Sequence, residues 1–293
     1  MKKDLISVAN LKPREVEEIF SLTDKLKKDK AKFAKALSGK TLALVFQKPS
    51  NRTRVSFEVG MYQLGGYPIY LGPDEINLGV RESIKDVAKT LSRYIDAIVL
   101  RTFAHNNVLE MAKYATVPVI NGLSDFSHPC QALADIYTIK EKLKHLKGLT
   151  LAYVGDGNNV CNSLLYACAK VGMNMNVATP KGYEPDGVVI NLFHQPEDAV
   201  KNADIIYTDV WASMGQEKEA AKRKKVFKNF QVNKKLVNLA KKNCLIMHCL
   251  PAHRGEEITD EIIESKNSVI FDQAENRMHV QKAILIKLMA GKK

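Results

Sequence analysis

The stretch "TLALVFQKPSNRTR", residues 41–54, joins an apolar run of strand length to a polar segment that carries two arginines. The run "TLALVF" is typical of a buried parallel strand, and Ser50 is a residue type that often caps the N-terminus of a helix. A strand followed at once by a helix is the repeating unit of α/β proteins. Residues 41–54 therefore predict a strand-to-helix turn with arginines at its mouth.

The two arginines at this turn are informative because arginine is rare in this chain, which has 9 Arg and 35 Lys among its 44 basic residues. The N-terminus of a helix offers free backbone N–H groups and the positive end of its dipole, which together bind phosphate. Ser50 and Thr53 add hydroxyl groups, and Arg52 or Arg54 adds a planar, bidentate fork. We interpret the turn as a phosphate site; the alternative is an ordinary capped helix with surface arginines.

Strand-length apolar runs recur along the whole chain, and amphipathic segments such as residues 83–94, 131–143 and 275–289 lie between most of them. This alternation predicts an α/β fold with two domains, each a parallel sheet flanked by helices. The charged segment 140–148 predicts the boundary, giving domains 1–145 and 146–293, and we expect the C-terminal helix to pack back on the first domain. The expected strands are residues 41–46, 68–71, 95–100, 117–120, 149–154, 175–178, 204–208, 244–247 and 268–271.

Composition narrows the class of protein. Hydrophobic residues at 45% and charged residues at 26% are ordinary for a globular protein, and we find neither a membrane-spanning run nor a signal peptide. The five cysteines are odd in number and widely spaced, which argues against disulfides and zinc and indicates a reducing cytoplasm.

The net charge of +12 fits either nucleic-acid binding or a lysine-rich surface that attracts small anions. We interpret the densest basic run, residues 218–230, as a solvated lysine-rich face.

Unusual polar residues follow the predicted strands, at the carboxyl ends where open α/β sheets bind ligands. Arg101 ends "AIVLR", "HPCQ" (128–131) comes shortly after "VPVI", and "GDGNN", "DVWASMG" and "HCLP" follow strands in the second half. This pattern predicts two sheets whose functional ends share one cleft. Read singly, Arg101 could form a structural ion pair, His128 could cap a helix, and Cys249 could be a buried structural cysteine.

The turn "VGDGNN" (154–159) is not a dinucleotide-binding fingerprint, because Val160 stands where the third glycine is needed. The next predicted strand also lacks an acidic residue for a ribose. An NAD-dependent dehydrogenase is therefore disfavoured. A glycine-rich turn that presents Asn158 or Asn159 to a ligand remains an open interpretation.

Taken together, these motifs resemble the aspartate/ornithine carbamoyltransferase family over essentially the full length of the chain. The matching motifs are S-x-R-T-R (50–54), H-P-x-Q (128–131), D-G-N-N (156–159), D-x-x-x-S-M-G (209–215), H-C-L-P (248–251) and A-E-N-R (274–277). The resemblance implies transfer of a carbamoyl group from carbamoyl phosphate to an amine, without metal or other cofactor. The S-M-G and H-C-L-P segments point to ornithine, giving citrulline and phosphate in arginine metabolism, with aspartate or putrescine as alternative acceptors. The resemblance also implies a homotrimer, or a multiple of trimers, with active sites between subunits.

The resemblance assigns residues as well, with carbamoyl phosphate held mainly by the first domain and ornithine by the second. Cys249, Arg101 and His128 are the expected catalytic residues, and we expect Cys249 to help deprotonate the acceptor amine while Asp209 anchors the α-amino group. Asn77 matches a glutamine that reaches the neighbouring subunit's site in bacterial members, and Asn51 stands where threonine is common. The expected carbamoyl phosphate contacts are Ser50, Asn51, Arg52, Thr53, Asn77, Arg101, His128, Gln131, Cys249, Leu250 and Arg277. The expected ornithine contacts are Asn159, Asp209, Ser213 and Met214.

Overall fold

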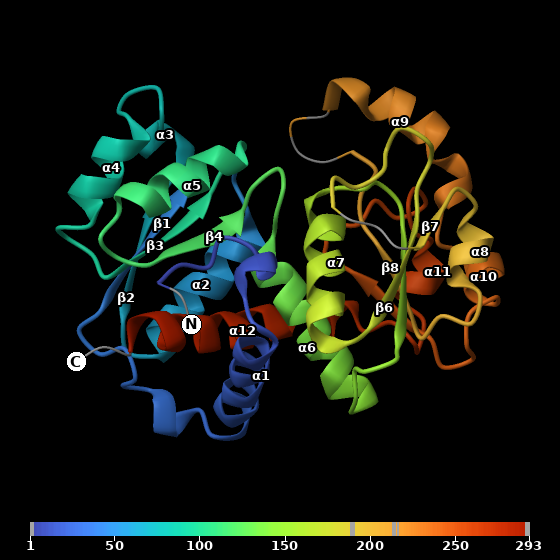
Figure 1. The fold of residues 1–293 in the computed structure, drawn as a ribbon, viewed down its shortest axis with the longest axis horizontal. Helices are drawn as coiled ribbons and strands as arrows, with labels where there is room; N and C mark the ends of the chain where they lie inside the picture. Colours follow the sequence, from blue (N-terminus) through green and yellow to red (C-terminus); the bar gives the residue numbers. More distant parts are fainter. Residues whose placement is uncertain (1–2, 188–190, 213–214, 216, 291–293) are drawn as a thin grey trace. The chain divides into compact units, whose positions relative to one another are not determined.

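The structure is a computed structural model that describes residues 3–187, 191–212, 215 and 217–290 (Figure 1). The chain divides into two compact units. Unit 1 is Met1–Tyr137 together with Glu275–Lys293, and unit 2 is Thr138–Ala274. Within the described residues, no helix combines the length and the apolar composition that crossing a bilayer would require.

Unit 1 is built on a four-stranded parallel sheet in the order β2-β1-β3-β4. The central strands β1 (Thr41–Phe46) and β3 (Ala97–Arg101) are almost wholly buried, as continuous apolar runs in a sheet covered on both faces should be. The outer strands are β2 (Tyr67–Leu71) and β4 (Val119–Leu123). The chain passes from β1 outward to β2 and then returns to β3 on the other side, so the strand order reverses between β1 and β3.

Helices complete unit 1. Ile84, Val87 and Met111 of α4 and α5 join a buried apolar cluster with residues of β1 and β3. Helix α12 lies beside α2, where Lys282 Nζ donates to Gln63 Oε1 at 2.9 Å (Figure 1). The helices are α1 (Pro13–Lys28), α2 (Asn51–Gln63), α3 (Pro73–Ile76), α4 (Ile84–Leu91), α5 (His105–Tyr114), the start of α6 (Pro129–Leu143) and most of α12 (Ile270–Met289), with 3-10 turns at Val8–Asn10 and Ala31–Phe33.

Unit 2 has a five-stranded parallel sheet in the order β7-β6-β5-β8-β9. The strands are β5 (Thr150–Val154), β6 (Asn174–Ala178), β7 (Asn191–Phe193), β8 (Ile205–Thr208) and β9 (Leu245–His248). Here the order reverses between β5 and β8, where Val154 lies opposite Thr208. The helices confined to this unit are α7 (Asn159–Val171), α8 (Pro196–Val200), α9 (Ala220–Val226), α10 (Lys234–Val237) and α11 (Asp260–Ile263), with 3-10 turns at Glu217–Glu219 and Lys228–Phe230.

The predicted fold class is confirmed, and eight of the nine expected strands overlap observed ones. The ninth, residues 268–271, is wrong: only Ser268 forms a bridge, to Ile246, and α12 begins at Ile270. A short apolar run such as "SVIF" cannot by itself distinguish a strand from the buried start of a helix. Strand β7 was not predicted; with three residues, it is too short to give a pattern of its own.

Candidate active site

The turn between β1 and α2 forms a capped helix start at the strand-order reversal of unit 1. Ser50 is the N-cap, and its Oγ accepts the backbone N–H of Thr53 at 3.3 Å, as the sequence predicted. Position 101 lies beside this turn, because Arg101 pairs with Phe46, the last residue of β1. The N-terminal N–H groups of a 13-residue helix therefore open onto the carboxyl ends of the two central strands.

Three arginines from distant segments converge around His128, and we call Arg52, Arg101, His128 and Arg277 the arginine cluster. Arg101, His128 and Arg277 are each at most 5% exposed. Arg277, on α12, donates from Nη2 to Thr53 Oγ1 at 2.7 Å. Burial holds the pKa of His128 well below its ordinary 6.5, and the positive charges of the three arginines push that pKa in the same direction. The imidazole is therefore neutral at pH 7, and the cluster is built to attract an anion.

Gln131 presents a buried acceptor in the same unit. It lies one turn into α6, is 1% exposed, and donates from Nε2 to Asp135 Oδ1 at 2.8 Å. Among the described residues, its Oε1 has no hydrogen-bond partner. Leaving a buried carbonyl oxygen unpaired is costly, so Gln131 is suited to accept an N–H donor from a ligand.

The structure separates the two arginines of the opening motif. The guanidinium of Arg54 lies 3.7 Å from the centre of the Tyr70 ring and pairs with Glu58 at 3.0 Å on the exposed side of α2. Of these two arginines, Arg52 is the one whose charge, with those of Arg277 and Arg101, lowers the pKa of His128. Asn77 is exposed, adopts φ 41° at the end of α3, and has no hydrogen bond to the arginine cluster among the described residues.

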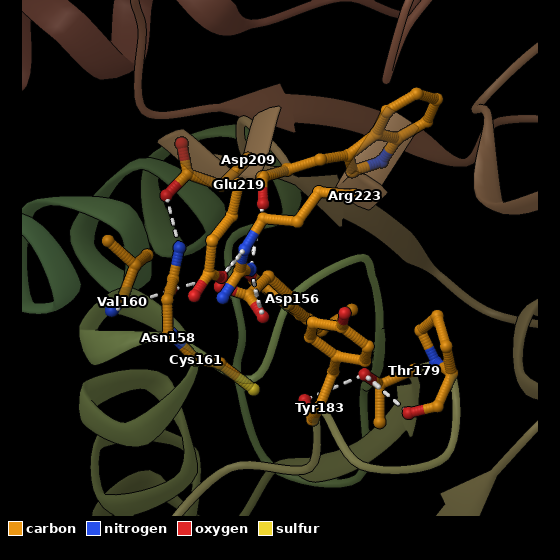
Figure 2. Close-up of polar contacts among 12 residues, drawn as sticks. Asp156, Asn158, Val160, Cys161, Thr179, Tyr183, Asp209, Glu219 and Arg223 are labelled. Atoms are coloured by element: carbon orange, nitrogen blue, oxygen red, sulfur yellow. Dashed lines mark hydrogen bonds and ion pairs between the residues drawn. The ribbon is translucent and has the colours of Figure 1, made fainter. Parts of the chain in front are cut away.

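Unit 2 carries a second cluster at its own strand-order reversal, which we call the cysteine cluster: Asn158, Asp209, His248 and Cys249. Asp209 follows β8, and its Oδ1 accepts from Cys249 Sγ at 2.9 Å and from the Val210 N–H at 2.8 Å. Its Oδ2 accepts from Asn158 Nδ2 at 2.7 Å (Figure 2). Asn158 is also the N-cap of α7, because its Oδ1 accepts from the N–H groups of Val160 and Cys161.

His248 holds the backbone around Cys249. Its Nδ1 accepts the Leu250 N–H at 2.8 Å, so the ring proton is on Nε2, which donates to the buried carboxylate of Glu257 at 3.0 Å. Leu250 adopts φ 59°, a left-handed conformation that costs a non-glycine residue about 1 kcal/mol. The bond from Leu250 to His248 helps to offset that cost. It therefore fixes the segment that carries Cys249.

Three residues of the cysteine cluster could together reach a metal ion: one ligand atom each from Asp209, His248 and Cys249 lies within 4.8 Å of the others. Both ring nitrogens of His248 are already hydrogen-bonded, however, and the Cys249 thiol points at Asp209. Binding a metal would require breaking these contacts. The residues as arranged fit proton and hydrogen-bond chemistry better than metal ligation.

Two family models of known proteins match this chain. Residues 3–141 match the family description "Aspartate/ornithine carbamoyltransferase, carbamoyl-P binding domain", and residues 147–288 match "Aspartate/ornithine carbamoyltransferase, Asp/Orn binding domain". The chain belongs to the aspartate/ornithine carbamoyltransferase family. It is 55% identical to the ornithine carbamoyltransferase of Thermococcus kodakarensis, covering 99% of this chain and 97% of that one. It is 56% identical to the anabolic ornithine carbamoyltransferase of Pyrococcus furiosus, covering 94% of this chain and 93% of the relative.

Solved structures of the carbamoyltransferase family agree with the fold. The ornithine carbamoyltransferase structure from Pyrococcus furiosus superimposes with a TM-score of 0.95 at 54% identity, covering 99% of this chain and 98% of that one. The enzyme from Giardia lamblia, at 34% identity and full coverage of both chains, still gives a TM-score of 0.89.

For three residues that are expected to contact ornithine, the structure does not show such a role. Ser213 and Met214 lie outside the described residues. Asn159 is half-buried at the first position of α7, and the side chain that reaches Asp209 belongs to its neighbour Asn158. The structure thus brings Asn158, one of the two asparagines that the sequence offered at this turn, to Asp209, while a ligand contact by Asn159 stays a prediction.

Sequence analysis missed a buried ion pair between Arg223 and Asp156, 3.0 Å apart (Figure 2). Lys222, Lys224 and Lys225 are exposed, as the interpretation of a solvated lysine-rich face required, but for Arg223 that interpretation is wrong. Burial raises the pKa of Asp156 to about 6, and the Arg223 guanidinium opposes that rise. The scarcity of arginine in the chain is the sequence signal that sets Arg223 apart from the lysines around it.

We predict that His128 does not titrate between about pH 6 and pH 8. Its pKa in the folded protein lies below that of the unfolded chain, so the stability it contributes is lost as the pH falls below 6.5. The 13Cε1 resonance of His128, assigned by its loss in His128→Gln, should keep a constant shift over that range. A titration midpoint at or above 6.5 would contradict the buried, arginine-flanked environment.

Proposed function

We propose that this chain transfers the carbamoyl group of carbamoyl phosphate to the side-chain amine of L-ornithine, giving L-citrulline and phosphate. The convergence of three arginines on a neutral, buried histidine at the N-terminus of α2 is the observation that carries the proposal. Such a site suits a phosphorylated anion. The relatives named ornithine carbamoyltransferase, which match over nearly the whole chain, support ornithine as the acceptor.

Unit 1 binds carbamoyl phosphate and its departing phosphate in this proposal. Carbamoyl phosphate is a mixed anhydride, so the amine attacks its carbonyl carbon and the C–O bond to phosphate breaks. Arg52 and the N-terminal N–H groups of α2 bind the departing phosphate, since both supply donors to its oxygens. We assign the carbonyl oxygen, which gains negative charge in the tetrahedral intermediate, to Arg101, Thr53 and His128. One such donor is commonly worth about 3 kcal/mol.

Gln131 and His128 add selectivity to this half-site. The buried, unpaired Oε1 of Gln131 suits the NH2 group of the carbamoyl moiety. A neutral His128 can donate one hydrogen bond without adding a fourth positive charge to the arginine cluster. Together these groups favour a carbamoyl phosphate over a simple phosphate, which has no amide to offer.

Unit 2 binds and deprotonates the acceptor amine in this proposal. A primary ammonium has a pKa of about 10.4 in water, so the acceptor must lose a proton before it can attack. Cys249 Sγ and Asp209 lie 2.9 Å apart, which provides a carboxylate for a cationic amine and an adjacent group for proton transfer. We assign removal of the side-chain proton to Cys249, which acts as the thiolate and becomes, on taking up that proton, the thiol that donates to Asp209. Asp209 anchors the α-amino group, and Asn159, Ser213 and Met214 complete the acceptor contacts.

Citrulline formation from carbamoyl phosphate tests the function directly. Ornithine, aspartate and putrescine would be compared at equal concentration, with release of phosphate measured in parallel. We expect turnover with ornithine and little with the other two amines. Preferred carbamoylation of putrescine or aspartate would keep the reaction type and reject ornithine; release of phosphate with no carbamoylated product would reject the transfer itself.

We also propose a cytoplasmic homotrimer or a multiple of it, in which Asn77 contacts the neighbouring subunit. Exposed apolar side chains on α2 and on the outer strand β2 support an interface on unit 1: Val55, Val59, Tyr62, Tyr67 and Ile69. No disulfide joins any two of the five cysteines, all of which lie in the described part of the chain, and this fits a reducing compartment. A monomeric mass in sedimentation equilibrium would contradict the assembly.

Arg52→Lys should weaken the binding of carbamoyl phosphate by about tenfold or more, because lysine keeps the charge and loses the bidentate fork. Arg54→Lys is the matched control: the same substitution two residues away, at an arginine that stacks on Tyr70. Titration calorimetry with carbamoyl phosphate measures both variants. Equal affinity in Arg52→Lys and Arg54→Lys would remove Arg52 from the phosphate site.

Cys249→Ala should lower kcat by about a hundredfold, the usual scale for loss of a proton-transfer group, and weaken carbamoyl phosphate binding much less than that. Cys161→Ala is the control, because this buried cysteine lies in the same unit but outside the cysteine cluster. Steady-state kinetics with ornithine gives kcat, and calorimetry gives the affinity. A Cys249→Ala enzyme with wild-type turnover would exclude the thiol from the mechanism.

A further inference from the structure

We infer that Arg223 is a positioning residue that sets the affinity of the site for its amine acceptor, by bracing the two loops that carry Asn158 and Asp209. This inference rests on the function proposed above. Arg223 lies in α9 and is only 7% exposed, although its neighbours Lys222 and Lys224 are exposed. A buried guanidinium within a lysine-rich helix calls for a local reason.

The guanidinium contacts three other segments of unit 2 as well as the N-cap residue of its own helix (Figure 2). Its Nη1 lies 3.0 Å from Asp156 Oδ1 and donates to the Trp211 carbonyl oxygen at 2.9 Å. Its Nε donates to Glu219 Oε2 at 3.1 Å, and its carbon lies 5.0 Å from the centre of the Tyr183 ring. The planar fork thus satisfies acceptors in several directions at once, which a lysine ammonium on a single stem cannot reproduce.

The two loops that Arg223 joins are the loops that carry the acceptor-side residues. Asp156 lies two residues before Asn158 in the loop after β5, and Trp211 lies two residues after Asp209 in the loop after β8. Asn158 and Asp209 in turn hydrogen-bond each other at 2.7 Å. The guanidinium therefore spans the strand-order reversal of unit 2 and fixes the distance between both loops. It has no hydrogen bond to Asp209 or Cys249 among the described residues, so its effect is indirect.

Removing the guanidinium would disturb the loop after β5 more than the rest of the unit. Burial is the main cause that raises the pKa of Asp156, and the nearby carboxylates of Asp209 and Glu219 raise it further. Without Arg223 the carboxyl group must either take up a proton or turn toward water. Loss of the guanidinium also removes the donor to the Trp211 carbonyl, and the two effects together shift Asn158 relative to Asp209. Displacements of about 1 Å in a site can cost about a hundredfold in rate or affinity.

Steady-state kinetics on Arg223→Gln and Arg223→Lys tests this role. KM for ornithine is measured at saturating carbamoyl phosphate, and KM for carbamoyl phosphate at saturating ornithine. L-Norvaline, which is ornithine without its reactive amine, serves as an unreactive probe whose affinity is measured by calorimetry in the presence of carbamoyl phosphate. Arg254→Gln is the control, because Arg254 also pairs with two carboxylates of unit 2, Asp260 and Glu264, but is exposed.

In Arg223→Gln we expect KM for ornithine and Kd for norvaline to rise about tenfold or more. KM for carbamoyl phosphate should stay within twofold, Arg223→Lys should recover part of the loss, and Arg254→Gln should match the wild type. A folded variant with a lower melting temperature and an unchanged ornithine KM would mean that Arg223 is only structural, and would overturn the inference. If Arg223→Gln does not fold, an unchanged ornithine KM in Arg223→Lys overturns it equally. Absence of citrulline from the wild type would instead reject the proposed function, before any variant is compared.

Discussion

The arrangement of this protein depends on one topological constraint, the reversal of strand order within a parallel sheet. Where the chain leaves a central strand toward one side and later returns on the other, the connections after the two central strands diverge. The carboxyl ends of those strands are then left uncovered. Unit 1 has this reversal between β1 and β3, and unit 2 has it between β5 and β8. The arginine cluster and the cysteine cluster lie at these two places.

The two clusters differ in charge as their proposed ligands do. The arginine cluster gathers three guanidinium groups around a histidine that burial keeps neutral, so its field is positive and suits a phosphorylated anion. The cysteine cluster offers a carboxylate, a thiol and an amide, which suit a cationic amine that must lose a proton. A single fold type repeated twice thus serves opposite electrostatic tasks, because the residues after the strands differ while the backbone arrangement recurs.

Behind each cluster lies a buried polar network that holds it in place. Thr53 joins α2 to α12 through Arg277, His248 and Glu257 fix the backbone around Cys249, and Arg223 with Asp156 braces two loops. Buried charges and amides are stable only when their partners are present, so such networks resist rearrangement. Burying these polar networks costs desolvation free energy. That cost is consistent with a requirement that the groups proposed to contact the substrates be placed accurately.

The sequence by itself determined the local elements: the strand 41–46, the cap at Ser50, the amphipathic helix over residues 131–143, and the choice of polar residues that follow each strand. These follow from residue type and period over a few neighbours. It also indicated the family through its motifs. It could not separate the helix start at residues 268–271 from a strand, because a short apolar run serves both.

Only the tertiary structure decided which strand ends adjoin, and hence which polar residues meet. It brought Arg52 and not Arg54 to His128, directed the amide of Asn158 at Asp209, and buried Arg223 in a run that reads as solvated lysine. Strand order is set by crossover connections and packing between residues far apart in the chain. A local pattern carries no record of those contacts, so the partners of each polar side chain become visible only once the sheets are assembled.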